Sequence, residues 1–566
     1  MNIVGLAGLC IDASSSLIQG NKVIAAIEEE RLKRIKHVSI IQSGGIPYES
    51  LEACLKIGKI NYTDINHIGY FFQPFREFFS MSSFRIKRSF TSPITILYYQ
   101  ISYLDNLRRH LTVKKILQDK CGKKVKFHNF SHHLCHAASV YYPSSFEDAA
   151  ILVIDAIGEI ESTSFYHAKD NKIKKILQYN FPNSLGFLYA LITDYLGFKS
   201  NNDEYKVMGL ASYGKATYYD KLKKVIKIKN TGEIRIDYSY FNRQFRGKQY
   251  FNEKFINEFG LQRSVNEEIN ERHFNMAASI QKLLEEVVIK MLHNLKKLTN
   301  SKNLCLSGGV ALNCKMNGLI LSKGSFENIH IEPAPHDAGC SLGSALLVKH
   351  QVLNINERDN NLTPYLGVSF SNDQIKIALD KSNIKYEYLE DITTITAKLL
   401  ANGKLIAWFQ GRDEWGPRAL GSRSILADPT IKDMKNIINK KIKNREEFRP
   451  FAPAVIEEQA KNYFDLSVSS PFMLYVVPVL EEAKQKIPAV GHVDGTARPQ
   501  TVNKNQNPIF YELLEKFHKE KGVPLLLNTS FNVKKEPNVH SPYDALRCFF
   551  TTGLDYLIIG NYLVKK

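Results

Sequence analysis

The sequence predicts an α/β protein built from two or three domains. Short apolar segments with strand character, such as 3–7 and 151–154, alternate with amphipathic helical segments along the chain, and this alternation is typical of the α/β class. A chain of 566 residues is too long for one hydrophobic core. The polar run 354–361 follows a helical segment and predicts a linker between a first domain, residues 1–355, and a second domain, residues 362–566.

The predicted elements of the first domain indicate an internal duplication. The strand 3–7 leads to a turn at Asp12, and the strand 151–154 ends on Asp155 as the chain turns. Paired lobes of this kind surround the nucleotide in the actin and sugar-kinase superfamily. Further along, apolar residues at helical spacing predict an amphipathic helix over 275–298 that packs on the core.

The composition is that of an ordinary globular protein, with 44% hydrophobic and 23% charged residues. The formal net charge of +18 invites a nucleic-acid partner, but the lysines are dispersed and form no long basic run, so we expect no nucleic acid. The 8 cysteines form no C-x-x-C pair, which argues for a reducing compartment. Met1 leads directly into a strand rather than a signal peptide, and no apolar run is long enough to span a bilayer, so we expect a cytoplasmic protein.

Two histidines and two aspartates predict a metal site. His132 and His136 are four residues apart and lie on the same face of a helix, while Asp155 ends a buried type of strand and Asp337 lies in a glycine-containing loop. Imidazoles combined with carboxylates suit Fe(II), Mn(II) or Zn(II) better than Mg(II) or Ca(II). The pair lacks the glutamate of the H-E-x-x-H motif, so a metallopeptidase is disfavoured.

A strand, a glycine loop and a helix over 304–313 predict an anion-binding turn. Ser307, Gly308 and Gly309 let backbone N–H groups approach an anion closely, and a helix N-terminus adds roughly 0.3–1 kcal/mol. The motif is neither a Walker loop nor a dinucleotide fingerprint. Two further polar turns occur at 12–16 and 204–210.

The second domain has arginines beside turn residues. They lie in the segments 416–424, 443–450 and 496–499, and a polar run occupies 528–532. Arginine forks on rigid proline and glycine turns suit bidentate phosphate binding. A single arginine of this kind is more simply a surface ion pair, but the recurrence within one domain favours phosphate binding.

With these motifs assembled, the chain resembles the NodU/CmcH-type O-carbamoyltransferases from the first strand to the last. The matching segments of the first domain are Asp12-Ala13-Ser14, Glu29-Glu30-Arg31, 132–139, 204–211 and 307–313. Those of the second domain are 416–421, 448–453, 492–500 and 528–532.

The resemblance implies a two-domain enzyme that transfers a one-carbon group. The first domain would have the duplicated actin-like, ribonuclease-H-like fold of the metal- and nucleotide-binding subunit of tRNA threonylcarbamoylation. The second domain would be YrdC-like and would convert carbamoyl phosphate and ATP to carbamoyl adenylate with loss of pyrophosphate. The first domain would then pass the carbamoyl group to a hydroxyl of a sugar or natural-product acceptor and release AMP.

The resemblance also implies a role for each matching residue. The metal ligands would be His132, His136, Asp155 and Asp337, holding Fe(II), with Mg(II) as a further candidate for binding ATP in the second domain. The nucleotide in the first domain would be held by Ser307, Gly308, Gly309 and Asn313, with Glu204 and Lys206 nearby. Carbamoyl phosphate and ATP would be held by Arg418, Arg423, Lys443, Arg449, Arg498, Asn528 and Ser530. Asp12 would orient or deprotonate the acceptor hydroxyl.

Three departures from the family pattern bear on these roles. Ala156 replaces a glycine after Asp155, Ile11 replaces a histidine before Asp12, and Lys535 replaces a glycine in a turn. Ile11 puts the acid/base assignment at the acceptor hydroxyl in question.

The alternatives are an enzyme or regulator of the threonylcarbamoyl-tRNA pathway and a non-catalytic nucleotide-binding scaffold. An RNA partner would need a continuous basic face, which the scattered lysines do not provide. The sequence leaves the acceptor and the oligomeric state open, with a homodimer as one option.

Overall fold

The computed structural model describes residues 1–88, 93–242, 250–360, 362–443, 446 and 448–566, and it divides into two compact units. The N-terminal unit comprises Met1–Glu29 and His37–Leu362, and the C-terminal unit comprises Glu30–Lys36 and Thr363–Lys566. The short segment 30–36 thus packs with the C-terminal unit, although our expected first domain, 1–355, included it.

The N-terminal unit contains two five-stranded sheets. In the first, the strand order is β3 (Lys22–Glu28), β2 (Ser14–Gln19), β1 (Asn2–Ala7), β4 (His67–Tyr70) and β5 (Lys126–Asn129). In the second, it is β8 (Lys172–Asn180), β7 (Glu161–Lys169), β6 (Asp148–Ile154), β11 (Asn303–Ser307) and β12 (Asn328–Ile331).

The two sheets have the same topology. In each, the first strand pairs antiparallel with the second, the second pairs antiparallel with the third, and two later strands extend the sheet in parallel from the first strand. Repetition of this unusual mixed order within one unit confirms the predicted duplication and the actin-like arrangement of the fold.

Helix α12 (Gly339–Leu347) packs between β1 and helix α5 (His132–Tyr141). A Cβ atom at Gly343 would lie 1.9 Å from the carbonyl oxygen of Cys135, so only glycine permits this approach of the two helices. The close packing fixes α5, and with it the two predicted metal ligands, against the centre of the unit.

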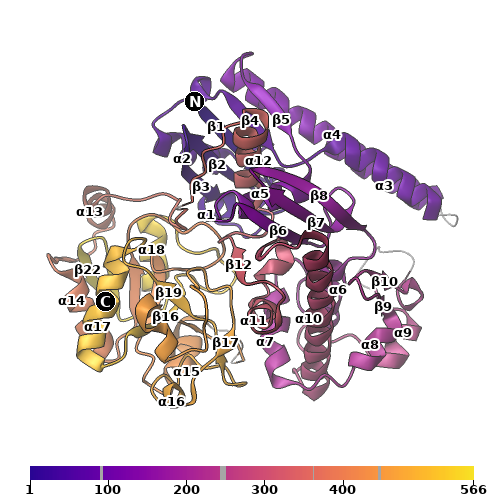
Figure 1. The fold of residues 1–566 in the computed structure, drawn as a ribbon. Coiled ribbons are helices and arrows are strands. Elements are labelled where there is room, and N and C mark those ends of the chain that lie inside the picture. The colour runs from indigo at the N-terminus through magenta and orange to yellow at the C-terminus, as the bar shows by residue number, and fades with distance from the viewer. Residues whose placement is uncertain (89–92, 243–249, 361, 444–445, 447) are drawn as a thin grey trace. The chain divides into compact units, whose positions relative to one another are not determined.

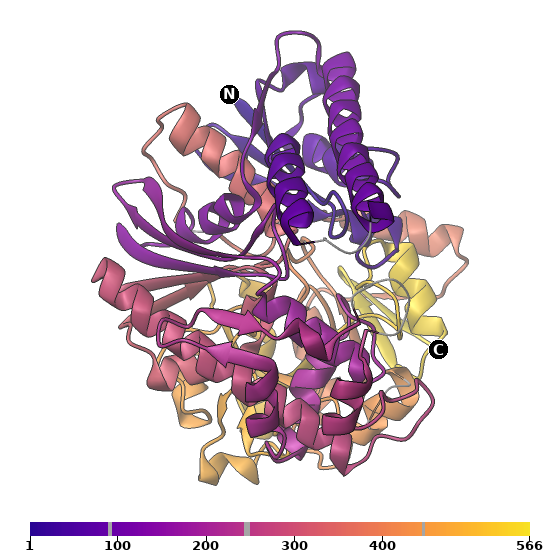
Figure 2. The same ribbon diagram turned by 90° about the vertical axis from the view of Figure 1, so that its right-hand side faces the viewer.

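The remaining helices of the N-terminal unit surround the sheets (Figures 1 and 2). They are α2 (Tyr48–Gly58), α3 (Pro74–Arg88), α4 (Pro93–Cys121), α6 (Leu185–Tyr195), α7 (Glu204–Leu210), α8 (Tyr219–Val225), α9 (Glu253–Phe259), α10 (Glu271–Thr299) and α11 (Cys314–Lys323), with a small hairpin of β9 (Ile226–Ile228) and β10 (Ile234–Ile236). Helices α3 and α4 lie side by side as a hairpin beyond the first sheet in both views. Helix α10 confirms the predicted amphipathic helix, because Met276, Leu283 and Met291 are fully buried along one stripe.

The C-terminal unit is built on an eight-stranded sheet. Its strand order is β13 (Glu387–Tyr388), β22 (Tyr562–Lys565), β21 (Tyr556–Ile559), β14 (Ile406–Phe409), β15 (Arg423–Ala427), β20 (Leu525–Ser530), β16 (Ala452–Ile456) and β19 (Gln500–Val502). The helices are α1 (Glu29–Lys33), α13 (Asn372–Lys381), α14 (Ile392–Ala401), α15 (Met434–Ile438), α16 (Glu481–Lys484), α17 (Pro508–Lys521) and α18 (Pro542–Phe550), and β17 (Val477–Pro478) pairs with β18 (Thr496–Ala497).

Helices α14 and α17 bury one face of the large sheet. Trp408, Leu526 and Phe510 form the centre of that apolar core. The chain is therefore an α/β protein in both units. Among the described residues, every helix is too short or too polar to serve as a bilayer-spanning segment.

Candidate functional site

The four predicted metal ligands come together at the end of the second sheet. His132 and His136 lie on the first turns of α5, Asp155 directly follows β6, and Asp337 lies in the loop before α12. The β6 strand is buried from Ala149 to Ile154, so it delivers Asp155 from the core to the edge of the sheet where the helices begin. We call these four residues the His/Asp cluster.

The donor atoms of the His/Asp cluster converge on one point. His132 Nε2 and His136 Nε2 are 3.0 Å apart, and Asp155 Oδ2 lies 3.4 and 3.2 Å from them. Asp337 Oδ1 lies 3.4 Å from His132 Nε2 and 3.7 Å from His136 Nε2. Ligands bound at about 2.1 Å from one ion are separated by roughly 3–3.5 Å, so these residues fit a single divalent cation.

Electrostatics keeps both carboxylates ionised. Burial by itself would raise their pKa values, but the two imidazoles lower the pKa of Asp155 well below its usual range. They also lower the pKa of Asp337 to about 2. Two anionic carboxylates facing two imidazoles in a buried setting are a suitable donor set for Fe(II), Mn(II) or Zn(II), and they leave the choice among these ions open.

Cys340 is an additional candidate ligand that the sequence analysis missed. Its Sγ and the ring nitrogens of His132 and His136 all lie within 4.8 Å of one another, and the residue is buried. Its position three residues after Asp337, in the first turn of α12, is the signal that could have identified it.

Two further side chains hold the histidines in place. Both carboxylate oxygens of Glu159 accept the backbone N–H of His132, at 3.0 and 3.2 Å, and so satisfy a donor at the N-terminus of α5. Ser307 Oγ lies 3.4 Å from His136 Nδ1 and 3.3 Å from the carbonyl oxygen of Pro335. A hydroxyl on the second ring nitrogen helps fix the orientation of a metal-binding imidazole.

The Ser307 hydroxyl thus faces His136 of the His/Asp cluster, and its contact with a nucleotide stays a prediction. The neighbouring Gly308 has φ +90°, and a Cβ there would lie 2.3 Å from the carbonyl oxygen of Ile154, so the position requires glycine. A Cβ at Gly309 would lie 3.2 Å from Asp155 Oδ1. The glycine loop thus adjoins the cluster directly, and its backbone N–H groups remain the candidates for binding an anion.

Asn313 lies at the N-terminus of α11, and its side chain forms hydrogen bonds within the protein. Its Oδ1 accepts the backbone N–H of Met316 at 3.0 Å and the side chain of Gln281 at 3.0 Å. Its Nδ2 donates to Gln281 Oε1 at 2.9 Å. The amide thus caps α11 and pairs with Gln281, and its binding to a nucleotide stays a prediction.

Glu204 and Lys206 lie on the first turn of α7 and point to different partners. Glu204 Oε1 accepts the backbone N–H of Asn201 at 2.6 Å, and burial raises the pKa of this carboxyl. Lys206 Nζ lies 3.1 Å from Asp203 Oδ2. The described contacts do not join these two side chains to the His/Asp cluster.

Asp12 lies in the turn after β1, in the left-handed region with φ 52°. Its Oδ1 is 2.7 Å from Nδ1 of His37, which also has a left-handed backbone, φ 54°. Ser14 Oγ, two residues on, donates to the carbonyl oxygen of Ala338 at 2.8 Å and so ties this turn to the loop of Asp337. His37 could not be found from a local pattern, because it lies 25 residues from Asp12.

In the C-terminal unit, the structure brings together Lys443, Ser530 and Asn532. Lys443 is 3% exposed, and its Nζ donates to Asn532 Oδ1 at 2.8 Å, to the Asn532 carbonyl at 3.0 Å, and to the Ser530 carbonyl. Ser530 Oγ donates to Asn532 Oδ1 at 2.7 Å. A buried ammonium group is thus held at the end of strand β20.

Asn528, on the same strand, faces the loop that carries Arg418. Its Nδ2 donates to the carbonyl oxygen of Ala419 at 3.2 Å and to Gln500 Oε1 at 3.0 Å. Arg418 is half-buried, and Arg449 Nη1 lies 3.7 Å from Glu446 Oε2. For Arg498, the described part of the chain offers no hydrogen bond or ion pair to its guanidinium group.

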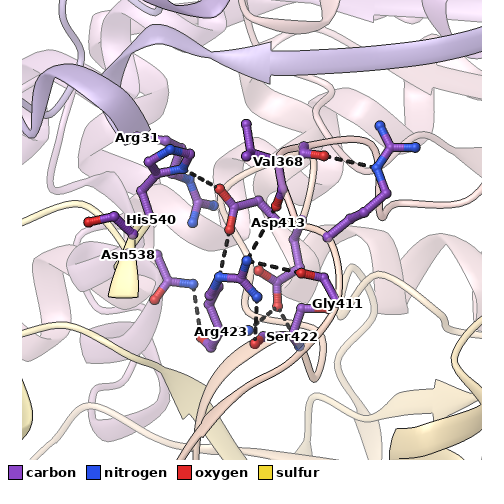
Figure 3. Close-up of polar contacts among 12 residues, drawn as sticks. Arg31, Val368, Gly411, Asp413, Ser422, Arg423, Asn538 and His540 are labelled. Atoms are coloured by element: carbon purple, nitrogen blue, oxygen red, sulfur yellow. Dashed lines mark hydrogen bonds and ion pairs between the residues drawn. The ribbon is translucent and has the colours of Figure 1, made fainter. Parts of the chain in front are cut away.

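Arg423 does not fit its predicted role of binding a nucleotide. It is 0% exposed, and its Nε lies 2.7 Å from Asp413 Oδ1 (Figure 3). The remaining N–H groups donate to four backbone carbonyls, those of Gln410, Gly411, Ser422 and Val368. Because no donor is left for a ligand, we correct this assignment and regard Arg423 as a structural residue.

A pH-dependent contribution to stability is expected from Glu161, beside α5. Burial by itself would raise the pKa of this carboxyl, but His133, Lys175 and Arg76 lower it to about 2. A depressed pKa means that the ionised form stabilises the folded state above about pH 5 and that this contribution, about 3 kcal/mol, is lost as the pH falls from 5 to 2. Urea unfolding of wild type and Glu161→Gln across this range should show the difference between them shrinking with falling pH, and a constant difference would refute the assignment.

Several known proteins are similar to this chain. The solved structure of HypF of T. kodakarensis aligns over 62% of this chain and 48% of the HypF chain, with a TM-score of 0.33 and 12% sequence identity. The uncharacterised protein sll1178 of Synechocystis is 38% identical over 608 residues, covering 100% of this chain and 97% of its own. The nodulation protein NolNO of Sinorhizobium fredii is 37% identical over 565 residues, covering 98% of this chain and 79% of its own.

Two family models account for nearly the whole chain. The model described as "Carbamoyltransferase N-terminus" matches residues 2–346, which include the His/Asp cluster, and "Carbamoyltransferase C-terminus" matches residues 397–566, which include Lys443 and the Arg418 loop. The chain therefore belongs to the carbamoyltransferase family.

Proposed function

We propose that this enzyme is an ATP-dependent O-carbamoyltransferase that works in two steps. In the C-terminal unit, carbamoyl phosphate and ATP give carbamoyl adenylate and pyrophosphate. In the N-terminal unit, a hydroxyl of a sugar or natural-product acceptor attacks the carbamoyl carbon and AMP leaves. The observation that carries the proposal is that each unit has its own buried polar constellation. In one unit it is the His/Asp cluster, and in the other it is Lys443 with Ser530 and Asn532, together with Asn528, which is hydrogen-bonded to Ala419 next to Arg418.

The first step requires water for its atoms to balance. Water cleaves carbamoyl phosphate to inorganic phosphate and carbamate, and a carbamate oxygen then attacks the α-phosphorus of ATP as pyrophosphate leaves. Apart from water, carbamoyl phosphate, carbamate and ATP are all anions, so the step needs fixed cationic groups. The Lys443 ammonium donates its three N–H groups to Ser530 and Asn532, so it would contribute fixed positive charge rather than a hydrogen bond, and Arg418, Arg449 and Arg498 would supply the bidentate phosphate contacts.

The second step would use the His/Asp cluster and the glycine loop beside it. His132, His136, Asp155 and Asp337 would hold a divalent cation, which would supply Lewis-acid stabilisation of charge on the leaving phosphate. The backbone N–H groups of Gly308 and Gly309 would bind the adenylate phosphate, and Asp12 would orient the acceptor hydroxyl.

The first test is pyrophosphate release by the purified full-length protein without any acceptor. We expect release from ATP that depends on added carbamoyl phosphate, with inorganic phosphate formed in equal amount. Arg449→Ala is expected to reduce the rate at least about 100-fold, since an arginine that stabilises phosphoryl charge contributes a factor of this order or larger.

A matched control is Arg547→Ala. This arginine lies in the same unit but forms an exposed pair with Glu536, so its loss should leave the rate unchanged. Absence of carbamoyl-phosphate-dependent pyrophosphate from a folded wild-type protein that binds ATP would overturn the proposal and favour a nucleotide-binding scaffold.

A further inference from the structure

We propose that Glu414 is the positioning residue that holds the Arg418 loop in the geometry needed to bind carbamoyl phosphate. The Arg418 loop is defined as residues 416–421. The inference rests on the proposed function for the role of Arg418 itself, but the evidence that Glu414 holds the loop is independent of that role.

One carboxylate oxygen of Glu414 gathers the backbone donors at the end of the loop. Oε1 accepts the N–H groups of Leu420 at 2.9 Å, Ser422 at 2.9 Å and Arg423 at 3.0 Å. The side chain is 3% exposed, so these bonds form away from water. Hydrogen bonds from N–H groups to an ionised carboxylate are roughly twice as strong as neutral ones, and three on one oxygen fix the course of the backbone.

The carbonyl groups of the loop are held from the opposite side. Leu420 O accepts hydrogen bonds from Tyr365 Oη and Gln500 Nε2, both at 2.8 Å. The other contacts are Asn528 Nδ2 to Ala419 O at 3.2 Å, Trp408 Nε1 to Gly421 O at 2.9 Å, and Arg31 Nη2 to Gly416 O at 2.7 Å. Buried side chains thus engage backbone N–H groups at Leu420, Ser422 and Arg423 and backbone carbonyl groups at Gly416, Ala419, Leu420 and Gly421.

The carboxylate is at the centre of this arrangement. It draws the chain into a tight turn in which Gly416 and Gly421 have φ +96° and +99°. It also lies close enough to Arg423 that its charge opposes the lowering of the Arg423 pKa caused by burial. Figure 3 shows Arg423 and Ser422 adjoining one another at the end of the loop.

The consequence is that Arg418 extends from a loop whose backbone is held on both sides of it, at Gly416 and at Ala419–Gly421. An arginine presented in this way loses little entropy when it binds phosphate, and it can enforce a bidentate geometry. If Arg418 binds carbamoyl phosphate, as the present proposal assigns, loosening the loop should weaken binding of that substrate and spare the contacts with ATP that other residues form.

The test is a double-mutant cycle in the full-length protein. Glu414→Gln keeps the shape of the side chain and removes its charge. We expect KM for carbamoyl phosphate to rise about tenfold and KM for ATP to change less than about twofold. In the Arg418→Ala background, the same substitution should raise KM for carbamoyl phosphate no further, because Glu414 acts through Arg418.

Two controls separate positioning from folding. Tyr365→Phe removes the hydroxyl that donates to Leu420 O and should raise KM for carbamoyl phosphate less, about twofold to threefold. This variant replaces Glu414→Gln in the cycle if Glu414→Gln does not fold. Hydrogen exchange of peptide 416–424 should be faster in Glu414→Gln than in wild type.

The outcomes distinguish the two proposals. An unchanged KM, or an equal effect in the Arg418→Ala background, overturns the positioning role. Unchanged hydrogen exchange in Glu414→Gln overturns the structural basis. If the wild type shows no carbamoyl-phosphate-dependent turnover but exchange is faster in Glu414→Gln, the structural basis is upheld, while the proposed function and the positioning role of Glu414 both fail.

Discussion

Replacing Asp413 by asparagine is expected to lower the free energy of unfolding of the C-terminal unit by about 3–5 kcal/mol. Asp413 is 1% exposed and receives two cationic or donor groups, Arg423 Nε at 2.7 Å and His540 Nδ1 at 2.6 Å. Asparagine would leave the buried Arg423 guanidinium without its ion-pair partner (Figure 3). Breaking one side of a fully buried pair costs far more than the pair itself contributes, because the other charge loses its compensation.

The measurement is urea unfolding followed by intrinsic tryptophan fluorescence. The protein has 2 tryptophans, and both, Trp408 and Trp415, are buried in the C-terminal unit, so the signal reports on that unit. Asp380→Asn is the control, since Asp380 forms an exposed pair with Lys376 and its loss should cost less than about 1 kcal/mol. Equal midpoints for Asp413→Asn and wild type would show that the buried pair is not needed.

The same pair predicts the response to acid. Burial by itself would raise the pKa of Asp413, but Arg423 and His540 lower it below its usual value. The ionised carboxylate therefore stabilises the unit above about pH 4, and this stabilisation is lost as the pH falls through the lowered pKa.

Replacing His136 by alanine is expected to abolish stable metal binding. His136 is 0% exposed and its Nε2 faces both His132 and Asp155, so alanine removes one of four converging donors. Loss of a neighbour of a metal ligand already weakens binding 10–100-fold, and loss of a ligand should weaken it more. Metal content after dialysis, measured by mass spectrometry, should fall by at least about 100-fold.

His167→Ala provides the comparison. His167 pairs with Asp148 outside the His/Asp cluster and should retain the metal. Pyrophosphate release should survive in His136→Ala, because the proposed chemistry of the C-terminal unit does not use the cluster. Full metal content in His136→Ala would exclude the cluster as the metal site.

The periodic elements and the His/Asp cluster could be predicted from the sequence. The stripe of apolar residues predicted α10, and the spacing of His132 and His136 predicted two imidazoles on one helical face. Asp155 could be predicted because a buried strand has to end at the edge of its sheet, where the chain turns. In each case the signal lies within a few residues, where backbone geometry alone decides which side chains are neighbours.

The roles of Arg423, Asn313 and Cys340 could not be predicted in the same way. An arginine beside a glycine turn has the same local sequence pattern whether its side chain binds a phosphate or backbone carbonyl groups. Only the fold shows that Arg423 binds carbonyl groups. Asn313 resembles a ligand until its partner Gln281, 32 residues away, is known. Such contacts depend on which distant segments meet, and local patterns carry no record of them.

The segment 30–36 has a consequence for how this protein can be divided or recombined. Arg31 donates to Gly416 O, and Arg34 Nη2 donates to Pro537 O at 3.0 Å, so the C-terminal unit uses side chains encoded near the start of the gene. A fragment that begins at the linker would lack both guanidinium groups and leave those carbonyls without their partners. Chimaeras between relatives with a single junction near residue 362 would also combine an N-terminal segment from one parent with its binding surface from the other. Substitutions in segment 30–36 and in the loops that it contacts are therefore expected to occur together when such proteins diverge.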